Sequence, residues 1–166
     1  GGWCCGTCRC CGWCYGTCGG GSIADQFGIC EGDGTLQGAI NASAEGSIVS
    51  VPDGVYPGGI EINQPITLIG NSSIIDVEGI YFGFSIQSND VIIDGFEIIG
   101  DGNTVSGITI TPGSSNITIQ NNTIHGMFLA NPSNVSPLSY GILAFGNGDG
   151  APNPPNDINI LNNEIY

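Results

Sequence analysis

The residues most able to bind metals or form covalent bonds are the cysteines, and seven of the eight lie within residues 1–21. An even number of cysteines in so short a segment favours disulfide bonds, as in small extracellular scaffolds. The run Cys8–Cys18 also has the spacing of cysteines that bind an iron–sulfur cluster, except that Gly19 replaces the usual proline. Zinc is a third alternative, since several of these cysteines have Cys-x-x-Cys spacing. The candidate disulfide or metal residues are Cys4, Cys5, Cys8, Cys10, Cys11, Cys14, Cys18 and Cys30.

Carboxylates and a single histidine are the other residues that could perform chemistry. Hydrolysis of a glycosidic bond needs a carboxylic acid and a carboxylate that flank the bond. Asp94, Asp101 and His125 are weak candidates for such a site, with Asp76 as a further neighbour. Lone polar residues at strand ends and in turns are usually only solvated. We therefore predict no convincing catalytic site, and we favour a protein that is not an enzyme.

Calcium binding is a weaker expectation from a few short acidic turns. A calcium ion takes about six to eight oxygen ligands, and no turn of this sequence supplies a complete set. The turns that could contribute ligands pair Glu31 with Asp33, Asp101 with Asn103, and Asn147 with Asp149.

Glycosylation sequons point to a secreted or cell-surface location, as do the cysteines. Sequons also arise by chance in a chain rich in asparagine, serine and threonine, so their use is an expectation only. The five Asn-x-Ser/Thr sequons begin at Asn41, Asn71, Asn116, Asn121 and Asn134.

The charge of the chain is strongly one-sided. Its 15 Asp and Glu residues face one basic residue, Arg9, which gives a formal net charge of −14. Nucleic acids and anionic membranes are bound mainly through Lys and Arg, so neither is an expected partner. The sequence contains no run of about 18 apolar residues, so we predict no membrane span.

Short apolar runs recur along residues 46–166 and indicate the fold class. Each run alternates apolar with polar residues and ends at Gly, Asn or Asp, which is typical of strands. Corresponding runs lie 24 to 26 residues apart, or further apart where a loop is inserted. This period predicts an all-β solenoid of about four to five coils, with a polar ladder of Asp94, Asn121 and Asn162 at one corner. The clearest runs are residues 60–62, 66–68, 91–93, 108–110, 117–119 and 158–160.

Domain organisation follows from a change in composition. Residues 1–30 hold the cysteines and a decapeptide repeat that is too short to bury a core, so we expect them to form an arm. Residues 31–166 form the solenoid domain. Residues 34–44 predict a short helix, with Leu36 and Ile40 on one face and Asp33 as its N-cap. We expect this helix to cover the N-terminal end of the stack.

Residues 46–56 (GSIVSVPDGVY) and then Ile66–Gly70 resemble the opening coil of the pectin-lyase-like superfamily. A helix before the first coil is similar to the superfamily pattern as well. The resemblance covers about residues 34–166 and implies a right-handed parallel β-helix. It implies little about activity, because this fold hosts lyases, hydrolases, epimerases and surface proteins. Pectate lyases of the superfamily use an Arg or Lys base beside bound calcium, and residues 31–166 contain neither residue type.

The first functional hypothesis is an extracellular structural or surface protein that associates with itself end to end. A solenoid has open ends that need caps, and the strand pattern reaches residues 163–166 without one. The Cys-rich arm would then link subunits of a filament or sheath.

The second hypothesis is a polysaccharide-binding or polysaccharide-degrading module, with a hydrolase favoured over a lyase. The longer loops at residues 126–140 and 146–156 would form its groove. Phe128, Tyr140 and Phe145 supply aromatic side chains that could stack on sugars.

Overall fold

The computed structural model describes residues 24–30, 32–101, 104–127, 139–146 and 153–166. These residues form one helix, α1 (Leu36–Ala42), and a series of short strands. The strands are β1 (Ser47–Val51), β2 (Gly54–Pro57), β3 (Ile60–Ile62), β4 (Ile66–Gly70), β5 (Ser73–Asp76), β6 (Phe82–Ile86), β7 (Val91–Asp94), β8 (Glu97–Ile99), β9 (Ser106–Ile110), β10 (Ser115–Gln120), β11 (Thr123–His125), β12 (Tyr140–Ala144), β13 (Asn156–Leu161) and β14 (Glu164–Ile165).

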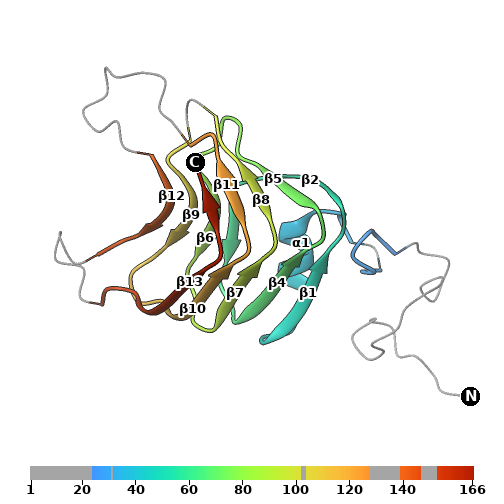
Figure 1. The fold of residues 1–166 in the computed structure, drawn as a ribbon. Coiled ribbons are helices and arrows are strands. Elements are labelled where there is room, and N and C mark those ends of the chain that lie inside the picture. The colour runs from blue at the N-terminus through green and yellow to red at the C-terminus, as the bar shows by residue number, and fades with distance from the viewer. Residues whose placement is uncertain (1–23, 31, 102–103, 128–138, 147–152) are drawn as a thin grey trace, which may run out of the picture.

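Consecutive strands are distributed in turn over three parallel sheets. The strand orders are β1-β4-β7-β10-β13, β2-β5-β8-β11-β14 and β3-β6-β9-β12. Figure 1 shows the strands stacked from β1 and β2 at one end of the molecule to β12 and β13 at the other. The predicted all-β, solenoid-like architecture with parallel sheets is therefore confirmed.

The strand register follows the sequence repeat. Ile66 pairs with Val91, which lies 25 residues later, and Val91 pairs with Ile117 after a further 26 residues. Ile117 pairs with Ile158 in spite of the 41-residue step between them, because the inserted residues leave the strand register unchanged. The β9–β12 pair behaves in the same way, since Ile110 pairs with Ala144 across a 34-residue step. Apolar periodicity therefore identified the strand partners correctly.

The core consists of apolar columns that run along the stack. One column contains Leu68, Ile93 and Ile119, and all three side chains are fully buried. A second column contains Ile98 and Ile124, which are also fully buried. Burial of one such side chain contributes about 1.5–3 kcal/mol, so these repeated columns provide the main stabilisation of the fold.

Two columns of left-handed residues turn the chain at the ends of one sheet. Such positions favour Gly, Asn and Asp, because other side chains clash with their own backbone there. This requirement explains why the chain is rich in these residue types. The first column contains Asp90, Asn116 and Asp157, and the second contains Gly95, Asn121 and Asn162, with φ between 51° and 78°.

Buried Asn122 and half-buried Asn163 form the main polar ladder. Asn122 is 1% exposed, its Oδ1 accepts from the N–H of Phe96, and its Nδ2 donates to Ile93 O. Asn163 repeats this arrangement one layer further on, since its Oδ1 accepts from the N–H and the Nδ2 of Asn122. Asn121 does donate to Asp94 at the predicted corner, over 2.8 Å. The predicted ladder, however, missed the inward-facing position one residue later.

Helix α1 is shorter than the predicted range of 34–44, and its cap differs. Thr35 is the N-cap, and its side chain accepts from the N–H of Gly38. Asp33 lies before the cap and accepts from both the N–H and the hydroxyl of Thr35. These hydrogen bonds, first that of the hydroxyl, hold the pKa of the exposed Asp33 carboxyl below its usual value. Buried Leu36 and Ile40 join the helix to the core.

Substitution of Gly107 should destabilise the fold. A Cβ at Gly107 would lie 2.7 Å from Gly141 O and 2.7 Å from Ile124 Cγ2, both closer than van der Waals contact allows. We expect Gly107→Ala to lower the free energy of unfolding by about 1–3 kcal/mol, as overpacked cores do. Gly146→Ala is the matched control, because a Cβ there meets no atom within 4 Å. Urea unfolding monitored by circular dichroism measures both, and equal stability of the two variants would contradict this packing.

Candidate functional site

Exposed large apolar side chains are concentrated at the two ends of the strand stack. Eight such residues occur in the described part of the chain. Tyr81 lies outside the end strands, and Phe145 directly follows β12, the end strand of the third sheet. The other six lie in β1, β2, β13 and β14 or directly after β14, and they are Ile48, Val55, Ile160, Leu161, Ile165 and Tyr166.

The C-terminal face, which we define as β13, β14 and Tyr166, exposes residues of the core columns. Ile160 continues the column of Ile119, and Ile165 continues the column of Ile124. Ile119 and Ile124 are fully buried, whereas Ile160 is 52% and Ile165 is 50% exposed. The difference arises because no further described layer covers the last strands. This face therefore exposes apolar side chains that the layers before it keep buried.

The backbone at the C-terminal face also has the geometry of a sheet edge. Among the described strands, β13 pairs only with β10, and β14 pairs only with β11. Unpaired N–H and C=O groups along such an edge favour the addition of another strand. The Asn122–Asn163 pair shows how polar groups are satisfied between layers, since each side-chain amide receives the N–H of the preceding layer.

His125 and Tyr166 make the most specific side-chain arrangement at this face. Their rings stack with centroids 5.2 Å apart and an interplanar angle of 8°. His125 Nε2 lies 3.0 Å from Glu97 Oε1, which holds the imidazole on its other side. Tyr166 remains 73% exposed. The Tyr166 ring therefore lies against His125, while most of its surface is left uncovered by the described residues.

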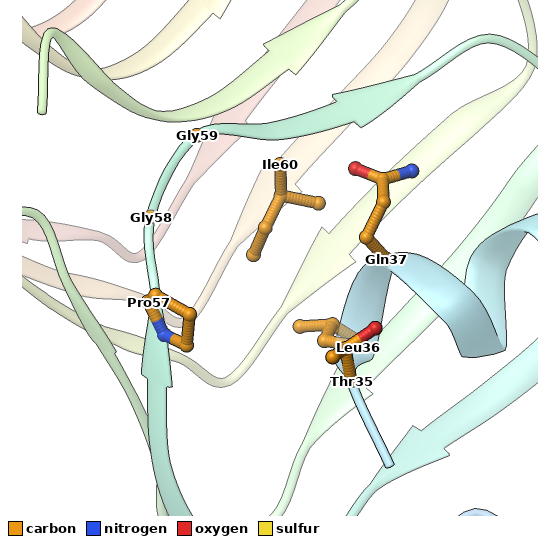
Figure 2. A pocket seen from close by; sticks show the side chains of 7 residues that line it. All are labelled: Thr35, Leu36, Gln37, Pro57, Gly58, Gly59 and Ile60. Carbon is orange, nitrogen blue, oxygen red and sulfur yellow. The ribbon is translucent and has the colours of Figure 1, made fainter. Parts of the chain in front are cut away.

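The opposite end carries a small cavity beside α1. It has a volume of about 200 Å³ and is lined by Thr35, Leu36, Gln37, Pro57, Gly58, Gly59 and Ile60. Figure 2 shows the strand segment from Pro57 to Ile60 on one side of the cavity and the start of α1 on the other. Gln37 fixes the two walls together, since its side chain bonds both the N–H and the C=O of Glu61.

The weak catalytic candidates are not grouped into a site. Asp94 accepts hydrogen bonds from Gln120 and Asn121 along the sheet corner. Asp101 accepts from the N–H of Gly79 and from the hydroxyl of Thr104 in a turn. His125 pairs with Glu97 instead. Each carboxylate thus has a structural partner, and no pair flanks a shared cavity in the described residues.

Only some of the residues predicted to bind calcium lie within the described part of the chain. Asp101 and Asp33 bind backbone and hydroxyl groups of neighbouring turns. Their expected partners Asn103 and Glu31 lie outside the described residues, as do Asn147 and Asp149. Within the described ranges, no group of three or more His, Cys, Asp or Glu side chains is arranged to hold a metal ion.

Of the eight cysteines, Cys30 is the one within the described residues, and it is disulfide-bonded. It also forms an antiparallel bridge with Ala24, ahead of α1. The other candidates, Cys4, Cys5, Cys8, Cys10, Cys11, Cys14 and Cys18, lie outside the described residues, so disulfide, iron–sulfur and zinc remain predictions there.

The sequon asparagines differ in whether their side-chain nitrogen, the atom that would carry a glycan, is already used. Nδ2 of Asn71 donates to Ser50, that of Asn116 to Asp90, and that of Asn121 to Asp94. Asn41 on α1 instead accepts from Gln37 through its Oδ1 and is exposed. Asn134 lies outside the described residues. Among the described sequons, Asn41 is therefore the most suitable acceptor.

Tyr56 gives the fold a specific pH dependence. Its hydroxyl donates to Pro52 O, and burial, followed by the charge of Asp53, raises the pKa of its phenol above the usual 10.0. A raised folded-state pKa means that the stabilisation is complete below pH 10 and is lost as the pH rises through the folded-state value. We expect the free energy of unfolding to fall in this range and Tyr56→Phe to show a smaller fall. Alkaline urea titrations with exposed Tyr81→Phe as control test this, and parallel curves for Tyr56→Phe and wild type would contradict it.

In comparisons with known proteins, no family model, curated protein or solved structure matches the chain. No helix in the described ranges has both the length and the apolar character needed to span a membrane. The described features that bear on function are the C-terminal face with its exposed core residues and the cavity at the opposite end.

Proposed function

We propose that this chain is an extracellular structural module that associates end to end, with the C-terminal face of one copy packed on the α1 end of the next. The observation that carries the proposal is the half-exposure of Ile160 and Ile165, whose column neighbours Ile119 and Ile124 are fully buried. Covering the remaining apolar surface of each residue would contribute about 1 kcal/mol.

The C-terminal face spans residues 156–166. A standard protein–protein interface uses about 20–30 residues on each side, so this face would form the apolar centre of the contact and not the whole of it. Because the two faces differ, their contact is head to tail and leaves a free face at each end, which generates filaments.

The proposed fold in full is a right-handed parallel β-helix of about four to five coils, covered by α1 at its N-terminal end. Three parallel sheets that receive consecutive strands in turn support it, and crossovers between parallel strands are almost always right-handed. A secreted or surface location is part of the proposal, supported by the disulfide at Cys30.

Sedimentation velocity over a range of protein concentrations tests the association. We expect species larger than one copy that grow with concentration and with added salt, because the net charge of −14 repels copies and salt screens it. Repetition with a reductant asks whether the Cys-rich arm links copies. A single slow species at every concentration and salt level would overturn the proposal.

Polysaccharide binding is the second candidate, favoured by one observation on the β6-β9-β12 surface. Phe82 and Tyr140 are half-buried and lie in register on either side of Ser106, outside the apolar core. Aromatic rings spaced along a sheet can stack on successive sugar rings. Affinity electrophoresis in neutral and acidic polysaccharides tests this, and unchanged migration of wild type and Tyr140→Ala in every gel would rule it out.

A further inference from the structure

We propose that the Cys-rich arm, residues 1–23, packs its tryptophans against the outer face of β2, β5 and β8 in its own copy. The arm is then an intramolecular clamp on the side of the stack. The contact lies within one copy and away from both ends of the stack, so it is separate from the end-to-end association proposed above.

The outer face of these three strands is largely apolar. Val55 on β2 is 64% exposed and pairs with half-buried Ile74 on β5. A second outward column contains exposed Pro57, then Asp76 and half-buried Ile99. Side chains alternate between the two faces of a strand, and the inward residues of the same strands belong to the buried core. We define the side face as Val55, Pro57, Ile74, Asp76, Glu97 and Ile99.

The arm joins the rest of the chain beside β2. Residues 24–30 form a compact loop that continues towards α1, and the Asp25 carboxylate holds it by accepting from three backbone N–H groups. Phe27 packs on the core, with its ring centroid 5.9 Å from that of Tyr56 in β2. Figure 1 shows this blue loop at the β1–β2 end of the stack. The arm is therefore attached next to the first strand of the side face.

The disulfide at Cys30 attaches the arm at a second point. The other seven cysteines of the chain all lie at residues 4–18, so an arm cysteine supplies the second sulfur of this bond. The bond limits how far the arm can extend from β2. An extended chain covers about 3.3 Å per residue, so the segment from Trp13 to Ala24 can still cross three strands spaced about 4.8 Å apart. Both attachments leave the side face within reach of the arm.

The composition of the arm complements the side face. Both tryptophans of the chain, Trp3 and Trp13, lie in the arm, which has almost no aliphatic residue of its own to cover them. A buried aromatic side chain removes about 150–250 Å² from water, and an apolar face across three strands can accept such rings. Arg9, the only basic residue of the chain, matches Asp76 and Glu97 on the face. Because an exposed ion pair contributes little, we expect the rings to supply most of the binding free energy.

Tryptophan fluorescence tests the contact in the full chain, because both tryptophans report on the arm. Val55→Asp places a carboxylate in the side face. Ile48→Asp is the matched control, since Ile48 is 68% exposed on the neighbouring strand β1. We expect the acrylamide quenching constant of Val55→Asp to rise at least about twofold over wild type, towards that of the urea-unfolded chain, and that of Ile48→Asp to stay unchanged. Circular dichroism checks that both variants keep the fold.

Three outcomes would overturn the inference: wild-type quenching equal to that of the unfolded chain, equal quenching of Val55→Asp and wild type, or release by Ile48→Asp as large as by Val55→Asp. Protection that appears only as the protein concentration rises would also overturn it, because a second copy would then cover the rings. Sedimentation of the wild type as a single copy with protected tryptophans would instead refute end-to-end association and support the clamp.

Discussion

Replacement of Asn122 by alanine should lower the free energy of unfolding by about 3 kcal/mol. The side chain is 1% exposed and serves two layers at once, because it accepts from the N–H of Phe96 and donates to Ile93 O and Asn163 Oδ1. Alanine would leave the buried Phe96 N–H and Ile93 O without the Asn122 side chain, and each unsatisfied group costs about 1–3 kcal/mol. Asn163 Oδ1 would keep the backbone N–H of residue 122. Water could restore part of this loss only by entering the core.

Asn159→Ala is the matched control for this prediction. Asn159 on β13 pairs with Thr118 on β10, and its side chain is exposed. The same substitution there should change the free energy of unfolding by less than about 0.5 kcal/mol. Equilibrium urea unfolding of both variants provides the comparison. Equal stability of Asn122→Ala and Asn159→Ala would show that the ladder does not hold the layers together.

Replacement of Ile160 by aspartate should weaken association at least about a hundredfold. The contact would lose the burial of an apolar side chain and would have to bury a carboxylate without a partner, and an unpaired buried charge is strongly unfavourable. Ile160 is already 52% exposed, so the stability of the single copy should fall much less than association does. Sedimentation velocity and urea unfolding measure the two effects separately.

Tyr81→Asp adds the same charge at a residue that is 73% exposed and lies outside the end strands. It should associate almost as strongly as wild type, with a small decrease from added net charge. A similar loss of association in Tyr81→Asp and Ile160→Asp would mean that charge, and not the C-terminal face, controls self-association.

Most of the sheet architecture could be predicted from the sequence, because β-strand pairing here repeats one apolar pattern. The runs beginning at Val91, Ile117 and Ile158 each place two inward isoleucines or valines at positions separated by one residue. Only one register buries all of them, since a shift by one residue would expose each of them. This is why the loops inserted before Ile158 did not obscure the pairing.

Local details were harder to predict, because two neighbouring residues of similar chemistry could each occupy the same structural position. Asn121 and Asn122 are adjacent, and the sequence does not show which of them faces inward. The left-handed backbone of Asn121, at φ 55°, turns the chain so that the Asn122 side chain enters the core. Likewise, Asp33 and Thr35 are both good N-caps, and hydrogen bonds from Thr35 to Asp33 assign the cap to Thr35.

The features at the two ends of the stack carried little sequence signal. The cavity is formed by α1 and a strand segment more than fifteen residues away, so it exists only after folding. The stack of Tyr166 on His125 joins residues 41 positions apart on neighbouring layers. A repeat alignment that placed Tyr166 one column after Ile165 would have brought it next to His125, and this was the available signal.

Hydrogen–deuterium exchange of the wild-type chain at low and high protein concentration tests end-to-end association most directly. Residues 156–166 form the edge that association would cover, whereas residues 117–124 are already inside the stack. We predict that exchange in 156–166 slows as concentration rises, while exchange in 117–124 does not change. Exchange in 156–166 at one rate across all concentrations would contradict the account.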